Sequence, residues 1–355
     1  MRLLATLLIG CLAALVVNNA RAYEPESGQW WNPAEPGIRY FIEIQDDYLV
    51  LVVAGGDPAG KAKWYLAQGR LDGNARFEAT LRSYTGIQPI GQAFTRRPVI
   101  ESSLGRVKIV FNANNNWRAR LTWPNGRSVS IRRYDNHFKR AEDTGGVTSY
   151  TLKMLGEWSV VSDISTNTEA SFPFSADVLV LDDYGYDNTS SLQTWVYEGC
   201  RPDDAQVGGC SNHALDNHDA FGFYEPPSNA FPAGVQVIVV KDGAYNGTMW
   251  YALYELAIGT NDGSGWFTLY PQGADPYDYD AYPARAFRTA SRTFVQEGTG
   301  PAKLGEDGAG RAGGLAAQLA AQGALPVRTK AMSPERAEHA AARLPLIRAL
   351  EARLD

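Results

Sequence analysis

The sequence lacks most of the signatures by which enzymes are recognised. It has three cysteines and four histidines in 355 residues, with neither a G-x-S-x-G nucleophile elbow nor an H-E-x-x-H helix. A G-x-G-x-x-G pattern occurs at Gly308, Gly310 and Gly313, but no strand precedes it, so it does not indicate a dinucleotide site. We therefore expect a non-catalytic protein.

Long apolar runs are absent beyond the N-terminus. Arg2, the apolar residues 3–17 and the small-x-small site Ala20-Arg21-Ala22 predict a signal peptide over residues 1–22. The alternative is a lipoprotein, because Leu8-Ile9-Gly10-Cys11 matches a lipoprotein box that would leave Cys11 lipidated. No later stretch reaches about 18 apolar residues, so we expect no transmembrane segment and a periplasmic or extracellular location.

Cysteine is scarce, and two cysteines remain after the signal peptide. Cys200 and Cys210 enclose a short loop, and an even pair in an exported protein predicts a disulfide. For a loop of this size the chain-entropy model gives about 2.5–3 kcal/mol of stabilisation. The alternative, a pair of zinc-binding thiolates, lacks matching Cys or His pairs nearby.

Positive charge is scarce in the second half of the chain. Residues 23–150 hold 17 basic and 13 acidic groups, whereas residues 151–295 hold 6 basic and 19 acidic groups. Binding to phosphate backbones needs a basic face, so the imbalance argues against nucleic acid as a partner of the second half. It leaves two interpretations open, namely docking between the halves and cation binding by the acidic half.

No segment before residue 296 shows a sustained helical period. Residues 117–123 alternate strictly between apolar and polar, which is typical of a strand with one buried face. Turn residues separate the strand candidates, which are 40–44, 48–53, 63–67, 76–83, 107–111, 117–123 and 127–134, and then 178–181, 235–240, 250–256 and 266–270. The chain is therefore predicted to be all-β.

The two halves repeat a common plan. Gly28-Gln29-Trp30 resembles Gly156-Glu157-Trp158, and the series Val52-Val53, Trp64-Tyr65, Asp72-Gly73, Phe77 resembles Val239-Val240, Trp250-Tyr251, Asp262-Gly263, Phe267. We expect two tandem antiparallel β-barrel or β-sandwich units with a low-complexity, partly helical C-terminal tail. The alternative is that unrelated β segments share a composition.

The expected boundaries follow from these patterns. They are a signal peptide (1–22), a first β domain (23–150), a second acidic β domain (151–295) and a Gly/Ala-rich linker with a short helix (296–355). A long insertion at residues 184–231 is expected to carry the disulfide. The tail helix is expected to start at Ser333-Pro334, to be interrupted at Pro345, and to be an appendage without a core.

The opening stretch resembles a module found in many exported bacterial proteins of unknown role. The matching residues are Gly28, Trp30, Trp31, Asn32, Pro33, Glu35 and Gly37, followed by Gln45, Asp47, Asp57, Gly60, Trp64 and Tyr65. The match covers residues 28–135. Pro36 and Arg39 depart from it, standing where Ser and Gly are usual, and the second half lacks the W-W-N-P core.

This resemblance implies a small exported β module, and it implies no catalytic residues because the family has no established activity. A Gly-x-Trp opening followed by a meander is also similar to barrels of the avidin and lipocalin kind. That analogy favours an eight-stranded barrel for each half, with a sandwich as the alternative.

Two groups of residues are candidates for ligand binding. Trp30, Trp31, Trp64 and Trp117 are predicted to form an aromatic platform for sugar rings. Since adjacent strand residues face opposite ways, one of Trp30 and Trp31 is expected in the core and the other at a rim. Trp64 and Trp250 are expected in the core.

Acidic loops supply the second group. Asp182, Asp183 and Asp187 lie in one loop and Asp275, Asp278 and Asp280 in another, so each is a candidate Ca²⁺ site, although neither has the EF-hand spacing. The segment with His213, Asp216, His218 and Asp219 is an alternative zinc site. The non-functional alternative for the two acidic loops and for the His213 segment is that they are solvated surface loops.

We therefore predict an exported non-catalytic binding protein whose ligand the sequence does not identify, with a glycan as the candidate ligand, Ca²⁺ as the candidate cofactor and a polysaccharide or another envelope protein as the candidate partner. One alternative is a secreted hydrolase with a carboxylate or His site in the second domain. The other is a structural or envelope-assembly component in which the oppositely charged halves mediate contact.

Overall fold

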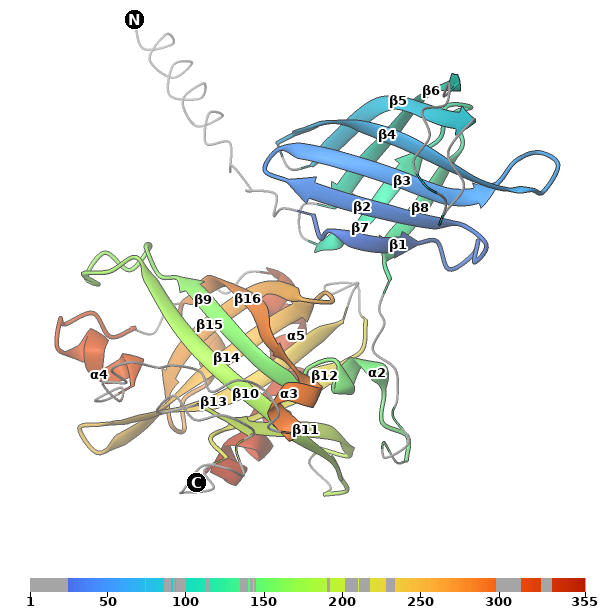
Figure 1. Cartoon of the computed structure of the whole chain (residues 1–355). Coiled ribbons are helices and arrows are strands. Elements are labelled where there is room, and N and C mark those ends of the chain that lie inside the picture. Colours follow the sequence, from blue (N-terminus) through green and yellow to red (C-terminus); the bar gives the residue numbers. More distant parts are fainter. Residues whose placement is uncertain are drawn as a thin grey trace, which may run out of the picture. The chain divides into compact units, whose positions relative to one another are not determined.

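A computed structural model describes most of the chain. The described residues are 25–73, 75–85, 91, 93, 100–112, 115–134, 140, 143, 145–189, 192–201, 210, 218–227, 234–297, 314–326 and 334–354. The predicted signal peptide and Ser333 lie outside them. The chain divides between Tyr134 and Asp135 into two compact units, each of which holds one closed barrel (Figure 1).

The first barrel is an eight-stranded antiparallel meander. Its strands are β1 (Gly28–Trp31), β2 (Arg39–Gln45), β3 (Tyr48–Gly56), β4 (Ala62–Asp72), β5 (Arg76–Thr85), β6 (Ile100–Asn112), β7 (Asn115–Thr122) and β8 (Ser128–Arg133). Each strand pairs with the next, and β8 pairs with β1. The barrel interpretation is thus confirmed over the sandwich.

The second barrel has the same topology. Its strands are β9 (Gly156–Asp163), β10 (Phe174–Asp187), β11 (Thr194–Cys200), β12 (Ala220–Glu225), β13 (Val235–Tyr245), β14 (Thr248–Ile258), β15 (Asp262–Pro271) and β16 (Ala281–Ser291). The last strand, β16, closes the barrel by pairing with β9. Short helices α2 (Ser149–Leu152) and α3 (Arg292–Glu297) flank the series.

Alternating side chains build the barrel interiors. In β2 the residues alternate between exposed and buried, so that Tyr40, Ile42 and Ile44 point inward. Tight turns complete the hairpins. Between β13 and β14, Asn246 and Gly247 both have positive φ, 50° and 76°, which is the backbone of a type I′ turn and suits these two residue types.

The same anchor opens both barrels. Trp30 and Trp158 are fully buried, and each indole N–H donates to the carbonyl four residues earlier, Glu26 and Met154, at 2.9 and 2.8 Å. In both barrels this tryptophan is paired in register with an arginine of the last strand, Arg133 or Arg288. The predicted correspondence of the two Gly-x-Trp segments therefore holds in three dimensions.

The rest of the predicted repeat alignment is wrong. It matched β3, β4 and β5 of the first barrel to β13, β14 and β15, which are the fifth, sixth and seventh strands of the second. The expected insertion at 184–231 is also wrong, because β11 and β12 lie within it and complete the barrel. Within that region the predicted disulfide between Cys200 and Cys210 is present, with the two Cα atoms 5.6 Å apart.

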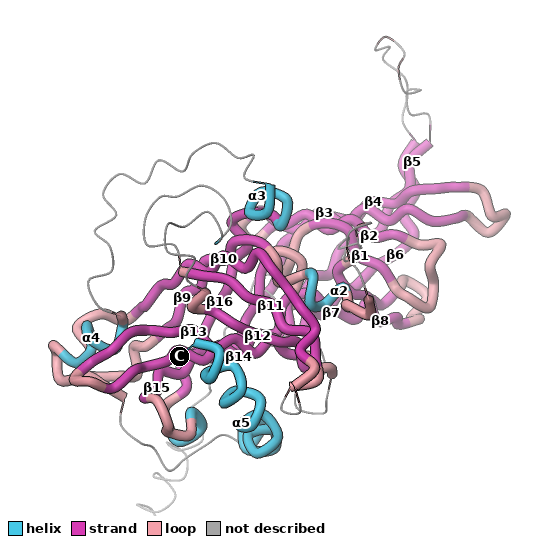
Figure 2. The backbone as a smooth tube through the Cα atoms, turned by 90° about the horizontal axis from the view of Figure 1, so that it is seen from below, coloured by secondary structure: helices cyan, strands magenta, loops and turns pink. Residues whose placement is uncertain are grey.

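The C-terminal tail is part of the second unit, which corrects the expectation of an appendage. Helix α5 (Pro334–Leu354) runs through Pro345 and buries Ile347, Leu350 and Leu354 against the outer face of the barrel (Figure 2). Arg343 on this helix is 1% exposed and forms an ion pair with Glu255 of β14 at 2.6 Å. None of the described helices is both long and apolar enough to cross a membrane.

This packing predicts a large effect of truncating the helix. Leu350→Ala should lower the free energy of unfolding of the second barrel by about 2–5 kcal/mol, because the side chain is fully buried. The control Val161→Ala, at a position 37% exposed on β9, should cost about 1 kcal/mol or less. Urea unfolding followed by circular dichroism distinguishes the two, and equal midpoints would show that the helix does not stabilise the barrel.

Candidate ligand-binding site

The four candidate tryptophans do not form a common platform. Trp30 is 0% exposed and Trp117 is 8% exposed, so both lie inside the first barrel. Trp31 points outward and is half-buried, as expected for the neighbour of a core residue. Trp64 was expected in the core but is 40% exposed and stacks on Tyr84, because in β4 the neighbouring Tyr65 takes the inward position.

Three of the six candidate calcium ligands make contacts that connect separate segments of the chain or cap a turn. Asp182 accepts from the backbone N–H of Cys210, and Asp187 forms an ion pair with Arg353. Asp275 caps the 3-10 turn η2 (Pro276–Asp278) by accepting from the N–H of Tyr277 at 2.9 Å. For Asp183 and Asp280 the described residues show no capping contact of this kind. Asp183 accepts from the backbone N–H of the next residue.

Among the described residues no three carboxylate, imidazole or thiol side chains lie close enough to share a metal ion. Asp278, which lies in η2, belongs to no such group either. The alternative zinc segment is tested only in part, because His213 and Asp216 lie outside the described residues.

One recess in the first barrel is the mouth at the end where β1 leads into β2. A cavity of about 520 Å³ opens there. Its wall is mainly apolar and aromatic and comprises Ile38, Val53, Tyr65, Leu81, Leu104, Trp123 and Pro124, with Gly55, Gly56, Asn125 and Arg127 completing it. This size and lining are typical of sites for small organic ligands.

Two backbone features shape the mouth. A β-bulge in β6 falls where Leu81 pairs with Gly105 and Arg82 with Ser103, so Leu104 is the extra residue and turns toward the cavity. Gly105 has a φ of +105°, and a Cβ there would lie 3.0 Å from Pro124. On β3, the inward-facing Gly55 has no side chain, which leaves space that a larger residue would fill.

Polar groups lie beside the mouth, next to the wall residues Trp123 and Arg127. Tyr40 is fully buried, its ring centroid lies 6.0 Å from that of Trp123, and its hydroxyl has no hydrogen-bond partner among the described residues. Burial raises the pKa of Tyr40 to about 12; the charge of Glu35 adds to the rise and that of Arg127 opposes it. Glu35 and Arg127 form an ion pair with each other. A neutral hydroxyl, that of Tyr40, therefore lies near an ion pair whose two charges balance, Glu35 and Arg127.

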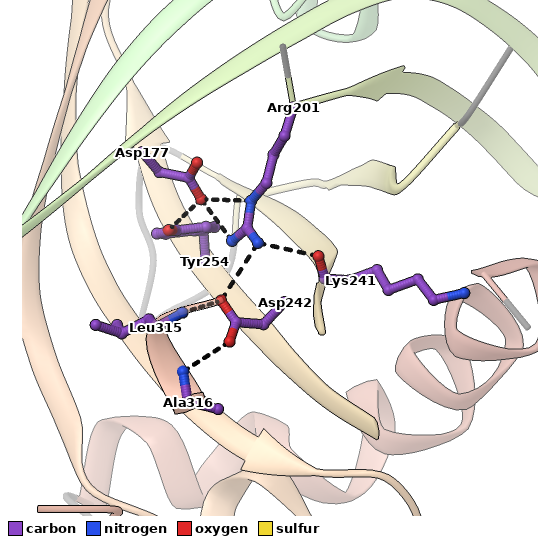
Figure 3. A network of polar contacts seen from close by, with 7 residues as sticks. All are labelled: Asp177, Arg201, Lys241, Asp242, Tyr254, Leu315 and Ala316. Carbon is purple, nitrogen blue, oxygen red and sulfur yellow. Dashed lines mark hydrogen bonds and ion pairs between the residues drawn. The ribbon is translucent and has the colours of Figure 1, made fainter. Parts of the chain in front are cut away.

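The second barrel is filled at the equivalent end. Asp177 accepts from the Arg201 guanidinium at 2.6 and 2.9 Å and from the Tyr254 hydroxyl at 3.0 Å (Figure 3). Asp242 accepts from Arg201 at 3.3 Å and from the backbone N–H of Leu315. Burial alone would lower the pKa of Arg201, but the adjacent carboxylates raise it overall, so the guanidinium stays charged.

A segment of the tail covers this network. Helix α4 (Leu315–Ala320) lies against that end of the barrel (Figure 1), and Leu315, Ala316 and Leu319 belong to the same buried cluster as the interior residues. The loop between β9 and β10 holds the segment in place, since Asn167 donates to the carbonyl of Ala324 at 2.8 Å. The two barrels thus share a frame but differ at this end, one with a cavity and one filled by its own chain.

Comparisons of the chain with protein-family models, with curated proteins and with solved structures give no match. The proposed site therefore stands on its own geometry. Sequence reasoning overlooked Leu104 and Trp123 as wall residues, and Tyr40 as the buried neighbour of Trp123. The Gly55-Gly56 pair at the end of a strand was the one local signal of open space in the barrel mouth.

Because the buried hydroxyl of Tyr40 has no partner among the described residues, its removal should not lower the free energy of unfolding. Tyr40→Phe should leave the free energy of unfolding unchanged or raise it by up to about 1 kcal/mol, because it removes an unpaired buried polar group. The control Tyr270→Phe removes a hydroxyl that donates to Glu351 at 2.8 Å, and it should cost about 1.5–3 kcal/mol. Denaturant unfolding measures both, and a loss for Tyr40→Phe as large as the control would contradict the assignment.

The network in the second barrel predicts a strong dependence of stability on Arg201. Arg201→Met removes the guanidinium that is paired with two buried carboxylates, Asp177 and Asp242, and should cost about 3–5 kcal/mol. Arg70→Met breaks an exposed ion pair with Asp47 and should cost about 1 kcal/mol or less. Urea midpoints at neutral pH test this, and a small effect at Arg201 would mean that the network is not held as described.

Proposed function

We propose that the first barrel is a binding domain for a small, neutral, largely apolar molecule that carries one hydrogen-bond acceptor. The observation that carries this is the open apolar cavity, behind whose wall residue Trp123 lies the buried Tyr40, with a hydroxyl that has no partner among the described residues. Such a group costs free energy unless something bonds to it. A ligand carbonyl or ether oxygen placed beside Tyr40 would supply that bond.

The charges at the mouth favour a neutral ligand. The charges of Glu35 and Arg127 compensate each other in an ion pair. The described residues at the mouth therefore present no uncompensated charge to an ionised head group. The apolar wall formed by Val53, Leu81 and Trp123 would remove the body of the ligand from water, at about 25 cal/mol per Å² of buried apolar surface. Affinity would come from this burial and selectivity from the single hydrogen bond.

The arrangement supports binding rather than proton-transfer catalysis. A tyrosine with its pKa raised to about 12 is a weak acid, and the nearby Glu35 is committed to Arg127. Binding in an exported protein remains the prediction for the whole chain. The contacts in the mouth bear on the first barrel alone, so Ca²⁺ binding by the acidic half and the hydrolase and assembly alternatives stay predictions.

The proposal is tested with a cavity-filling variant. Gly55→Val places a side chain in the mouth without a backbone clash, because a Cβ at this position would lie 3.9 Å from Ile38. The control Gly185→Val adds the same group at an exposed strand position of the second barrel, where nothing lies within 4 Å. Both variants should fold as the unsubstituted protein does.

The probe is 6-propionyl-2-(dimethylamino)naphthalene, a neutral ketone whose emission shifts to the blue in apolar surroundings. We expect saturable binding to the unsubstituted protein and to Gly185→Val, and affinity at least about tenfold weaker for Gly55→Val, which corresponds to about 1.4 kcal/mol. Tyr40→Phe should bind with a further blue shift, because the ketone loses its hydrogen bond. Equal affinity for both glycine variants, or no saturable binding at all, would refute the proposal.

A further inference from the structure

A second recess lies on the outside of the first barrel, away from the mouth. It has a volume of about 510 Å³ and crosses strands β6, β7 and β8. Arg118, Arg120 and Arg132 line it, together with Val110, Ser130 and Asn32. We call it the arginine groove. Three guanidinium groups in one recess identify it as a site for anionic groups.

The strand register sets the arginines side by side. Arg118 of β7 is directly opposite Arg132 of β8, and Arg132 is directly opposite Trp31 of β1. Arg120 lies two residues from Arg118 on the same strand, and hence on the same face. With neighbouring strands about 4.8 Å apart, the cations extend along the surface rather than around one point.

Trp31 orders the neighbouring guanidinium groups. The Cζ atoms of Arg39 and Arg132 lie 5.6 and 5.5 Å from the centroid of its ring. These cation–π contacts reduce the freedom of both side chains and so favour bidentate bonds to an oxyanion. Three strand spacings separate Arg39 in β2 from Arg118 in β7, which corresponds to a distance of about 14 Å across the sheet.

The strand register also sets like charges opposite one another, since Arg118 of β7 faces Arg132 of β8. A ligand that lies along the groove therefore meets positive charge from both strands. The ligand must carry several anionic groups along its length to match a row of cations.

We propose that the arginine groove binds a linear acidic polysaccharide. The recess fits a chain better than a flat bilayer, because Arg118 is half-buried within it. Trp31 is flanked by guanidinium groups, so it is poorly placed to stack on the bases of a single-stranded nucleic acid. Ser130 and Asn32 place a hydroxyl and an amide in the same recess, where they match sugar hydroxyls.

The test uses the full chain with polygalacturonate, a linear polysaccharide whose anionic groups are all carboxylates. We expect saturable binding at about 50 mM salt that weakens at about 0.3 M, where screening is stronger. Arg118→Gln with Arg132→Gln should weaken binding at least about tenfold, whereas Arg118→Lys with Arg132→Lys should lie in between, since charge is kept and the planar fork is lost.

The matched control is Arg70→Gln with Arg76→Gln, two exposed arginines outside the groove with the same total charge change. It should change the affinity less than about twofold, a smaller effect than removal of two groove contacts. Thermal unfolding checks the folding of both pairs, and Arg120→Gln alone serves as a second groove variant. The naphthyl ketone should still bind to the groove variants, which separates this test from that of the mouth.

Three results would overturn the proposal. They are an equal loss of affinity in the control pair, tighter binding to phosphatidylglycerol vesicles or to single-stranded DNA than to polygalacturonate, and the lack of saturable binding to polygalacturonate at low salt. The first would indicate general charge attraction, and the second would assign the groove to a membrane or a nucleic acid.

Discussion

Each barrel depends on the closure of its meander, in which the last strand pairs with the first around a buried tryptophan. In both units the tryptophan N–H is bonded to a carbonyl four residues earlier, and an arginine from the last strand bonds to carbonyls of the opening segment, Arg133 to Ser27 and Arg288 to Leu155. Removing a sheet edge in this way leaves no unpaired strand. The repeated anchor fixes the same frame twice.

Within this frame the two interiors have different contents. In the first barrel Trp30 and Phe111 pack the interior away from the mouth, with their ring centroids 5.6 Å apart in an edge-to-face contact, while the mouth stays open. In the second barrel the corresponding end holds Arg201 with two aspartates and is covered by α4. The second barrel therefore has its interior occupied by its own side chains and helix at this end, whereas the first has an open apolar cavity there.

Sequence alone predicted the parts of the fold that follow from local patterns. The alternation at residues 117–123 predicted β7, and the even cysteine pair predicted the disulfide. Strands β11 and β12 were missed because helix α5 and neighbouring side chains bury their outer faces, which removes the alternation. The mouth was not predictable, because it depends on Val53, Leu104 and Trp123 meeting from three separate hairpins and on a bulge that reorients Leu104.

We propose that the first barrel receives a ligand at its mouth, whereas the same end of the second barrel is filled by the chain itself. A crystal structure of the full protein soaked with the naphthyl ketone tests this most directly. The account predicts ligand density between Val53, Leu81 and Trp123, with the ketone oxygen within hydrogen-bond distance of Tyr40 and no ligand inside the second barrel. Density inside the second barrel with α4 displaced, or a first barrel whose mouth is closed by its own side chains, would contradict it.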